Sequence, residues 1–185
     1  MMKKRLFLSS LLLIGILGLG SIAYTVIEDR ASSVITASNV KIQANIVDEQ
    51  GNEASNSLQV APATRVTRMM SVTNIGDQPA WVRLQVRLVD IKDTYIVQEK
   101  GLLLDNENIE LTNQDTKWIY QDGYFYYTEI LQPTQTSDAL FSSIEFLSSM
   151  DNSYANSSIY IELEAQGVQS KHQGNSVLEA KGWPE

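Results

Sequence analysis

The chain has 185 residues, a formal net charge of -8, one histidine and no cysteine. Its 43% hydrophobic and 19% charged residues suffice for one core, which argues against wholesale disorder and against a multi-span membrane protein. Beyond the basic residues 3–5, the chain carries 11 basic against 22 acidic residues, so we expect no nucleic-acid partner, because phosphate binding needs clustered Lys and Arg. The lack of cysteine excludes disulfides, thiolate metal sites and cysteine nucleophiles.

The first 23 residues have the pattern of a signal peptide. Basic residues 3–5 precede the apolar run 6–17, and small residues follow. Ser21 and Ala23 predict cleavage between Ala23 and Tyr24, which would leave 162 of the 185 residues. We therefore expect a secreted protein.

An uncleaved membrane anchor is the alternative interpretation of the same segment. Residues 6–27 carry no charge, and about 20 apolar residues can span a bilayer. In either case the basic start stays in the cytoplasm and the remaining chain is exported.

Alternation of apolar and polar residues predicts the first strand within 39–47, and the polar segment 48–57 is expected to be a loop. A second strand is predicted over 66–73, where Arg68 interrupts the apolar face. A third is predicted over 81–89. The short turn between the second and third strands indicates that they form an antiparallel pair.

The strongest hairpin signal covers residues 118–128. Asp122 and Gly123 stand between two aromatic runs, and both tolerate the positive φ of a primed turn. The segment before it contains only weak strand candidates at 95–97 and 109–111.

The last part of the folded region contains one ambiguous segment and one clear strand. Residues 139–150 fit a strand or a short helix equally well, whereas 159–165 alternate clearly. Residues 170–185 form a polar tail with Val177, Leu178 and Trp183 as apolar anchors. The strands between 24 and 169, without recurring helical patterns, predict an all-β, antiparallel β-sandwich of the jelly-roll type.

The residues offer little catalytic chemistry. His172 stands in the polar tail, where a solvated side chain is expected. The acidic pairs Asp90 with Asp93 and Glu162 with Glu164 have the residue types of a glycosidase, but solvation is the better interpretation of the second pair, on the polar face of a strand. We expect no enzyme, no cofactor and no metal site.

The order of several short motifs resembles a known family. These motifs are 20–24 at the end of the signal, 74–76, Trp81 and Arg83, Trp118, Asp122 and Gly123, Tyr124, Tyr126 and Tyr127, Thr136, 140–141 and 168–169. This order is similar to that of exported proteins with SipW-dependent signal peptides, the TasA and camelysin group, and most closely to the BsaA-like biofilm matrix proteins.

The resemblance implies a secreted fibre subunit of a Gram-positive bacterium, located in the extracellular matrix or at the cell surface and folded as a jelly-roll-like sandwich. Its implied partners are other copies of itself, a signal peptidase of the SipW type and accessory matrix proteins. The camelysin name also implies a protease, although no residue identified above supports that activity.

Cleavage would release residues 24–36, a segment rich in β-branched residues. We predict that it pairs with an edge strand of the next subunit, because strand addition satisfies main-chain hydrogen bonds in both partners. The residues expected to support this polymerisation are Tyr24, Val26, Ile27, Val34 and Ile35. The alternative is that the segment pairs within its own subunit or remains unpaired.

A cell-surface carbohydrate-binding sandwich or a camelysin-like protease is the competing functional class. Tyr124 and Tyr126, two residues apart on one hairpin strand, would stack on sugars if they were exposed. The cluster of Trp81, Arg83 and residues 124–127 is also a candidate interface, with about half of its aromatic side chains expected in the core.

Overall fold

Strands dominate the computed structural model, which describes residues 25–33, 40–54, 58–90, 93–101 and 108–184. These ranges contain twelve strands and three short 3-10 helices. Within the same ranges, no helix is both long and apolar enough to cross a membrane. The predicted all-β class is therefore confirmed.

The strands and 3-10 helices follow one another in this order along the chain. They are β1 (Thr25–Ser33), β2 (Ile42–Val47), β3 (Leu58–Val60), β4 (Thr64–Thr67), β5 (Met69–Asn74), β6 (Ala80–Val89), β7 (Thr94–Ile96), η1 (Glu99–Gly101), β8 (Ile109–Thr112), β9 (Trp118–Gln121), β10 (Tyr124–Tyr127), β11 (Ser143–Phe146), η2 (Asn152–Tyr154), β12 (Ser158–Gln169) and η3 (Val177–Glu179).

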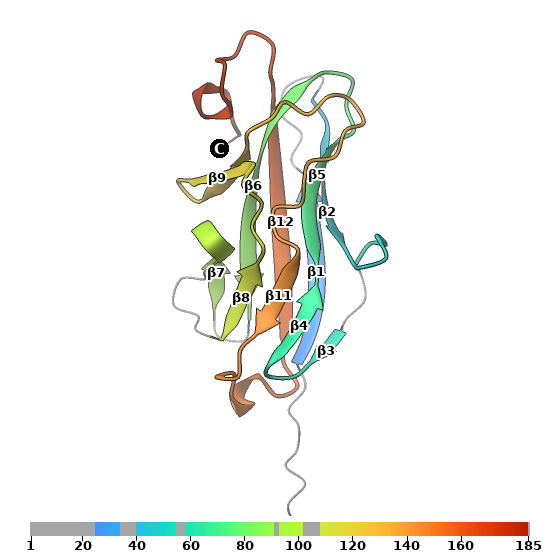
Figure 1. The fold of residues 1–185 in the computed structure, drawn as a ribbon, viewed down its shortest axis with the longest axis vertical. Helices are drawn as coiled ribbons and strands as arrows, with labels where there is room; N and C mark the ends of the chain where they lie inside the picture. The colour runs from blue at the N-terminus through green and yellow to red at the C-terminus, as the bar shows by residue number, and fades with distance from the viewer. Residues whose placement is uncertain (1–24, 34–39, 55–57, 91–92, 102–107, 185) are drawn as a thin grey trace, which may run out of the picture.

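The largest sheet has the strand order β3-β1-β12-β6-β10-β9, and β7 also pairs with β6. Its two longest strands, β6 and β12, pair along ten residues and form the centre of the sheet (Figure 1). Among the described strands, every pairing is antiparallel except that of β1 with β12, which is parallel.

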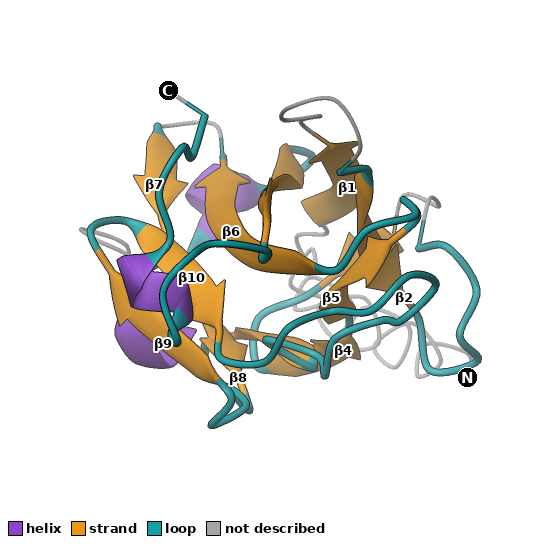
Figure 2. Cartoon of the chain, turned by 90° about the horizontal axis from the view of Figure 1, so that it is seen from above, coloured by secondary structure: helices purple, strands orange, loops and turns teal. Residues whose placement is uncertain are grey.

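A second layer covers one face of this sheet and completes the sandwich. It consists of the sheet β4-β11-β8 and the pair β2-β5, and Figure 2 shows both layers from above. The alternating apolar residues of the two layers form one buried cluster, which includes Val82, Leu84, Val86, Leu88, Ile161, Leu163, Ile42, Val72, Leu111 and Ile144. Each such side chain contributes roughly 1.5–3 kcal/mol when it is fully buried, so packing between the layers stabilises the fold.

The predicted strand 66–73 is divided at the residue that interrupts its pattern. The chain forms β4 before Arg68 and β5 after it, and these strands belong to different sheets of the second layer. Arg68 N donates to Ser142 O at 3.0 Å and Met70 N donates to Phe141 O at 3.0 Å. The backbone groups at the division are therefore satisfied by the segment that leads into β11.

The predicted antiparallel pair of 66–73 with 81–89 is wrong, because β5 pairs with β2 whereas β6 pairs with β12, β10 and β7. Asn74 explains the difference. Its Nδ2 donates to Gln78 O at 2.8 Å and to Leu131 O at 2.9 Å, and its Oδ1 accepts from Gly76 N at 3.0 Å. These bonds hold the turn as a crossover between the layers instead of a hairpin.

The hairpin predicted over 118–128 is confirmed as β9 and β10. Its turn residues have the expected positive φ, 50° at Asp122 and 83° at Gly123. The rings of Trp118 and Tyr127, which face each other across the strands, have centroids 5.0 Å apart.

The remaining sequence predictions have clear outcomes. The weak candidates 95–97 and 109–111 correspond to β7 and β8, and the ambiguous segment 139–150 contains the strand β11. The predicted loop 48–57 is a turn where it is described, up to residue 54. The late strand is longer than predicted, because β12 continues to Gln169.

Candidate functional site

β1 lies between β12 and β3 of its own sheet. Its pairing with β12 runs from Val26 opposite Ser158 to Ser33 opposite Ala165. In the single chain, the described part of the strand-forming segment therefore pairs within its own molecule. Donation to a second copy would require β1 to leave this position.

Only part of the predicted polymerisation segment is described. Val26 and Ile27 lie at the beginning of β1, and Ile27 is in register with the buried Ile159. Tyr24, Val34 and Ile35 lie outside the described residues, as does the predicted cleavage site between Ala23 and Tyr24.

The register of β1 against β12 defines how the strand is held. Four buried residues of β12 are in register with Ile27, Asp29, Ala31 and Ser33. The parallel pairing satisfies main-chain hydrogen bonds, and such bonds are independent of side-chain identity.

Arg83 is the centre of a cluster on the outer face of the main sheet, away from the second layer. Its Nε donates to Gln166 Oε1 at 2.7 Å and its Nη1 donates to Tyr126 OH at 2.9 Å. The guanidinium carbon lies 3.8 Å from the centre of the Tyr124 ring and 4.7 Å from that of Trp183. Stacking of this kind is worth about 0.5–2 kcal/mol, so the cluster fastens β6, β10 and β12 to the C-terminal segment.

The polar tail folds back over this cluster. Val177 and Ala180 are buried against Trp81 and Tyr126, and Pro184 O accepts a hydrogen bond from Arg83 Nη2 at 3.2 Å. The indole nitrogen of Trp81 is buried and has no hydrogen-bond partner among the described residues. The tail is therefore a folded part of the domain in the described residues 170–184.

The tail covers one of the two tyrosines that were considered for sugar stacking. Tyr126 is only 7% exposed, and its ring packs edge-on against Trp183 with centroids 5.7 Å apart. Tyr124 is partly exposed, but its ring lies against the Arg83 guanidinium.

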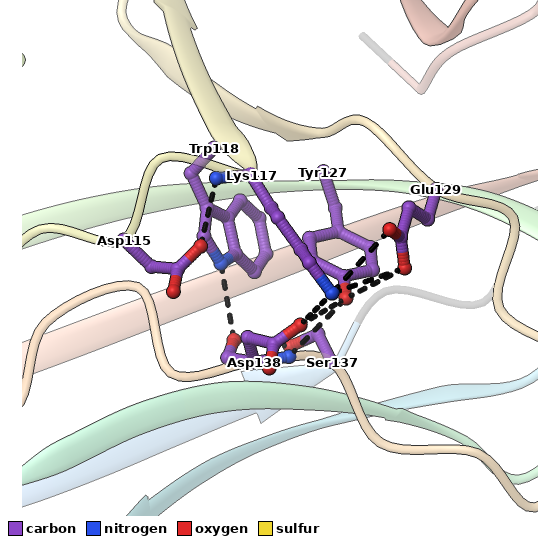
Figure 3. Close-up of polar contacts among 7 residues, drawn as sticks. All are labelled: Asp115, Lys117, Trp118, Tyr127, Glu129, Ser137 and Asp138. Carbon is purple, nitrogen blue, oxygen red and sulfur yellow. Dashed lines mark hydrogen bonds and ion pairs between the residues drawn. The ribbon is translucent and has the colours of Figure 1, made fainter.

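A second polar cluster joins the β9-β10 hairpin to the segment 137–138 (Figure 3). Lys117 Nζ lies 2.9 Å from Asp138 Oδ2 and 3.3 Å from Glu129 Oε1. Tyr127 OH donates to Asp138 Oδ2 at 2.6 Å, and Trp118 Nε1 donates to Asp138 O at 3.0 Å. The hairpin is thereby tied to one short segment by both charged and neutral bonds.

The electrostatics of this cluster favour an ion pair. The hydrogen bond from Tyr127, followed by that from Lys117, lowers the pKa of Asp138, and the carboxylates of Asp138 and Glu129 raise the pKa of Lys117. Burial, followed by the bond to Asp138, raises the pKa of Tyr127 to about 12.

A lysine amine between two carboxylates also has the composition needed for an amide cross-link. The side chains of Lys117 and Asp138 are 42% and 45% exposed, and their nitrogen and oxygen atoms lie 2.9 Å apart. In the structure the two groups therefore form an ion pair.

Of the other acidic and basic candidates, only Asp90 is buried. Arg87 lies 3.5 Å from Glu162 and 3.4 Å from Glu164, and His172 is exposed. Asp90 accepts hydrogen bonds from Tyr154 OH and from the backbone N–H of Asp93. Within the part of the chain that the structure describes, no three His, Asp or Glu residues lie close enough together to hold a metal ion.

The sequence analysis identified some members of the Arg83 cluster and of the Lys117–Asp138 cluster, but not their polar partners. It singled out Arg83, Trp118 and Tyr127 but missed their partners Gln166, Lys117 and Asp138. These partners are polar residues in strands and turns, and nothing in their local pattern distinguishes them from solvated positions. The unusual Trp183 in a polar tail was the one available signal.

The chain was compared with protein-family models, curated proteins and solved structures. No family model, curated protein or solved structure matches it.

Proposed function

We propose that this protein is a secreted structural subunit of extracellular matrix fibres, in which β1 of one copy occupies the position beside β12 of the next. One observation carries the proposal. The pair of β1 with β12 is the single parallel pair among the described strands, and β1 is the first of these strands along the chain.

Exchange of β1 between copies conserves the bonds that hold it. A donated β1 in the same register would form the same main-chain hydrogen bonds with β12 and β3 of the receiving copy. A copy that has donated its own β1 exposes the edges of β12 and β3, which are then open to the next strand. Contacts of this head-to-tail kind do not close, so they extend into a filament.

The predicted signal peptide and the resemblance to biofilm matrix proteins support the same role. Export would place the chain where a matrix fibre assembles, and cleavage before Tyr24 would leave β1 at the new N-terminus. The proposed partners are other copies of the chain, with a SipW-type signal peptidase acting before assembly.

A disulfide between β1 and β12 tests the exchange. Val26 and Ser158 are in register on neighbouring strands, whose spacing of about 4.8 Å suits a disulfide. The chain has no native cysteine. The mature double variant Val26→Cys with Ser158→Cys, oxidised after assembly, should give a ladder of covalent oligomers on a non-reducing denaturing gel.

The control pair is Gln43→Cys with Thr73→Cys. These residues are in register between β2 and β5, which remain in one body, so this variant should give only monomers. Monomers from the β1-β12 pair in filaments seen by electron microscopy would contradict strand exchange. A product that stops at dimers would show reciprocal exchange and would contradict the fibre.

A further inference from the structure

Two exposed isoleucines lie at the end of the domain where strands β2 and β6 begin. Ile75 is 53% exposed and Ile130 is 36% exposed. Ile75 N donates to Lys41 O at 2.9 Å, and the residue after Ile130, Leu131, exchanges backbone hydrogen bonds with Ala80. The loops that carry both isoleucines lie at the upper end of the molecule in Figure 1.

The C-terminal end of β1 points to the same end of the molecule. Ser33 is in register with Ala165, and β12 continues from there to Gln169, which pairs with Ala80 at the start of β6. β1 therefore runs toward the loops of Ile75 and Ile130.

The length of the connection limits where a donating copy can lie. Six residues, 34–39, separate Ser33 from Val40, and this length of chain spans at most about 25 Å. A copy whose β1 is inserted in a neighbour must therefore keep its Val40 within that distance of the neighbour's Ser33 position. Ile75 lies beside this point, because it is hydrogen-bonded to Lys41.

We infer that the end surface formed by Ile75, Ile130, Lys41 and Asp77 is the contact between neighbouring copies in the assembled fibre. The inference rests on the proposed strand exchange and adds the surface on which the two bodies meet. Exposed Lys41 and Asp77 carry opposite charges, so Lys41 of one copy can face Asp77 of the next in a contact that repeats along the fibre, with the apolar residues buried between the two copies.

A cysteine cross-link reports this contact directly. Assembled Ile75→Cys protein, treated with a short bismaleimide, should give covalent dimers. The matched control is Ile96→Cys. Ile96 is 41% exposed but lies on β7, which pairs with the far end of β6, so this variant should remain largely monomeric after the same treatment.

The double variant Ile75→Ser with Ile130→Ser provides the second measurement. Loss of the apolar contact should raise the critical concentration for polymerisation about tenfold or more, while the β1-β12 disulfide ladder persists in the filaments that do form. The variant Ile96→Ser should leave the critical concentration unchanged.

The two experiments distinguish the proposed end contact from the proposed strand exchange. A disulfide ladder without Ile75→Cys dimers, or an unchanged critical concentration in the double variant, would overturn the end contact and leave strand exchange intact. Absence of the ladder would overturn both.

Discussion

At the scale of single residues, Tyr127 and Asp138 join the two layers of the sandwich. Tyr127 belongs to β10 of the main sheet, and its hydroxyl donates to Asp138 at 2.6 Å. The preceding residue, Ser137, donates its N–H to Val72 O at 2.8 Å and accepts from Val72 N, and Val72 lies in β5 of the second layer. A buried hydroxyl thus connects the hairpin with the opposite layer.

Tyr127 should make the protein sensitive to alkaline pH. Its pKa rises from 10.0 to about 12 in the folded chain, so its contribution to stability is complete below pH 10 and is lost as the pH rises through 12. Thermal unfolding of the wild type should show a loss on the order of 2 kcal/mol across this window. In Tyr127→Phe the loss should be clearly smaller; equal losses in both proteins would refute the assignment.

At the scale of elements, the close approach of η1 to β8 depends on Gly101, the last residue of η1. Gly101 has φ 73°, and a Cβ at this position would lie 1.7 Å from Leu111 O, a backbone atom of β8. Such an overlap cannot be relieved by a side-chain rotation, so β8 itself would have to move.

Replacement of Gly101 by alanine should therefore cost about 3 kcal/mol or more of unfolding free energy, as measured by urea denaturation. Gly51→Ala is the matched control. Gly51 has a similar φ of 79° with no atom within 4 Å of the added Cβ, so only the backbone strain of about 1–2 kcal/mol applies. Similar losses for the two variants would contradict the steric explanation.

The elements also show how far sequence patterns predict this fold. Period-two alternation located β2, β6 and β12, and the Asp-Gly turn located the β9-β10 hairpin, because those signals are local. Alternation specifies which face of a strand is buried but not which strand lies beside it. The pairing of β5 with β2 and the parallel pairing of β1 with β12 depend on contacts between distant residues, so the sequence could not distinguish them from simple neighbours.

The sequence also identified only part of the surfaces that the proposed fibre would use. Val26 and Ile27 were identified from their β-branched surroundings, and the structure places them in β1. The end surface was missed, because Ile75 belongs to a segment that reads as an ordinary turn. Ile75 can be placed at the end toward which β1 runs only when the register of β1 with β12 is known.

At the scale of the whole molecule, charge should control the rate of assembly. The chain beyond residue 5 carries 11 basic and 22 acidic residues, and the pI of the complete sequence is about 4.7. Acidification from pH 7 toward pH 5 reduces the repulsion between copies, so light scattering should show faster polymerisation. Added salt at pH 7 should have a similar effect by screening; no response to either condition would argue against electrostatic control.

The parallel pairing of β1 with β12 has a consequence for the order of events during export. Val26 meets Ser158, a residue 132 positions later in the chain. In the proposed export, β1 would emerge first and could pair in its own sheet only after β12, the last described strand, had followed, and closing so long a loop is slow. During this interval a folded copy with an unoccupied position beside its β12 could bind the free strand, so the rate of export would limit the growth of the proposed fibre.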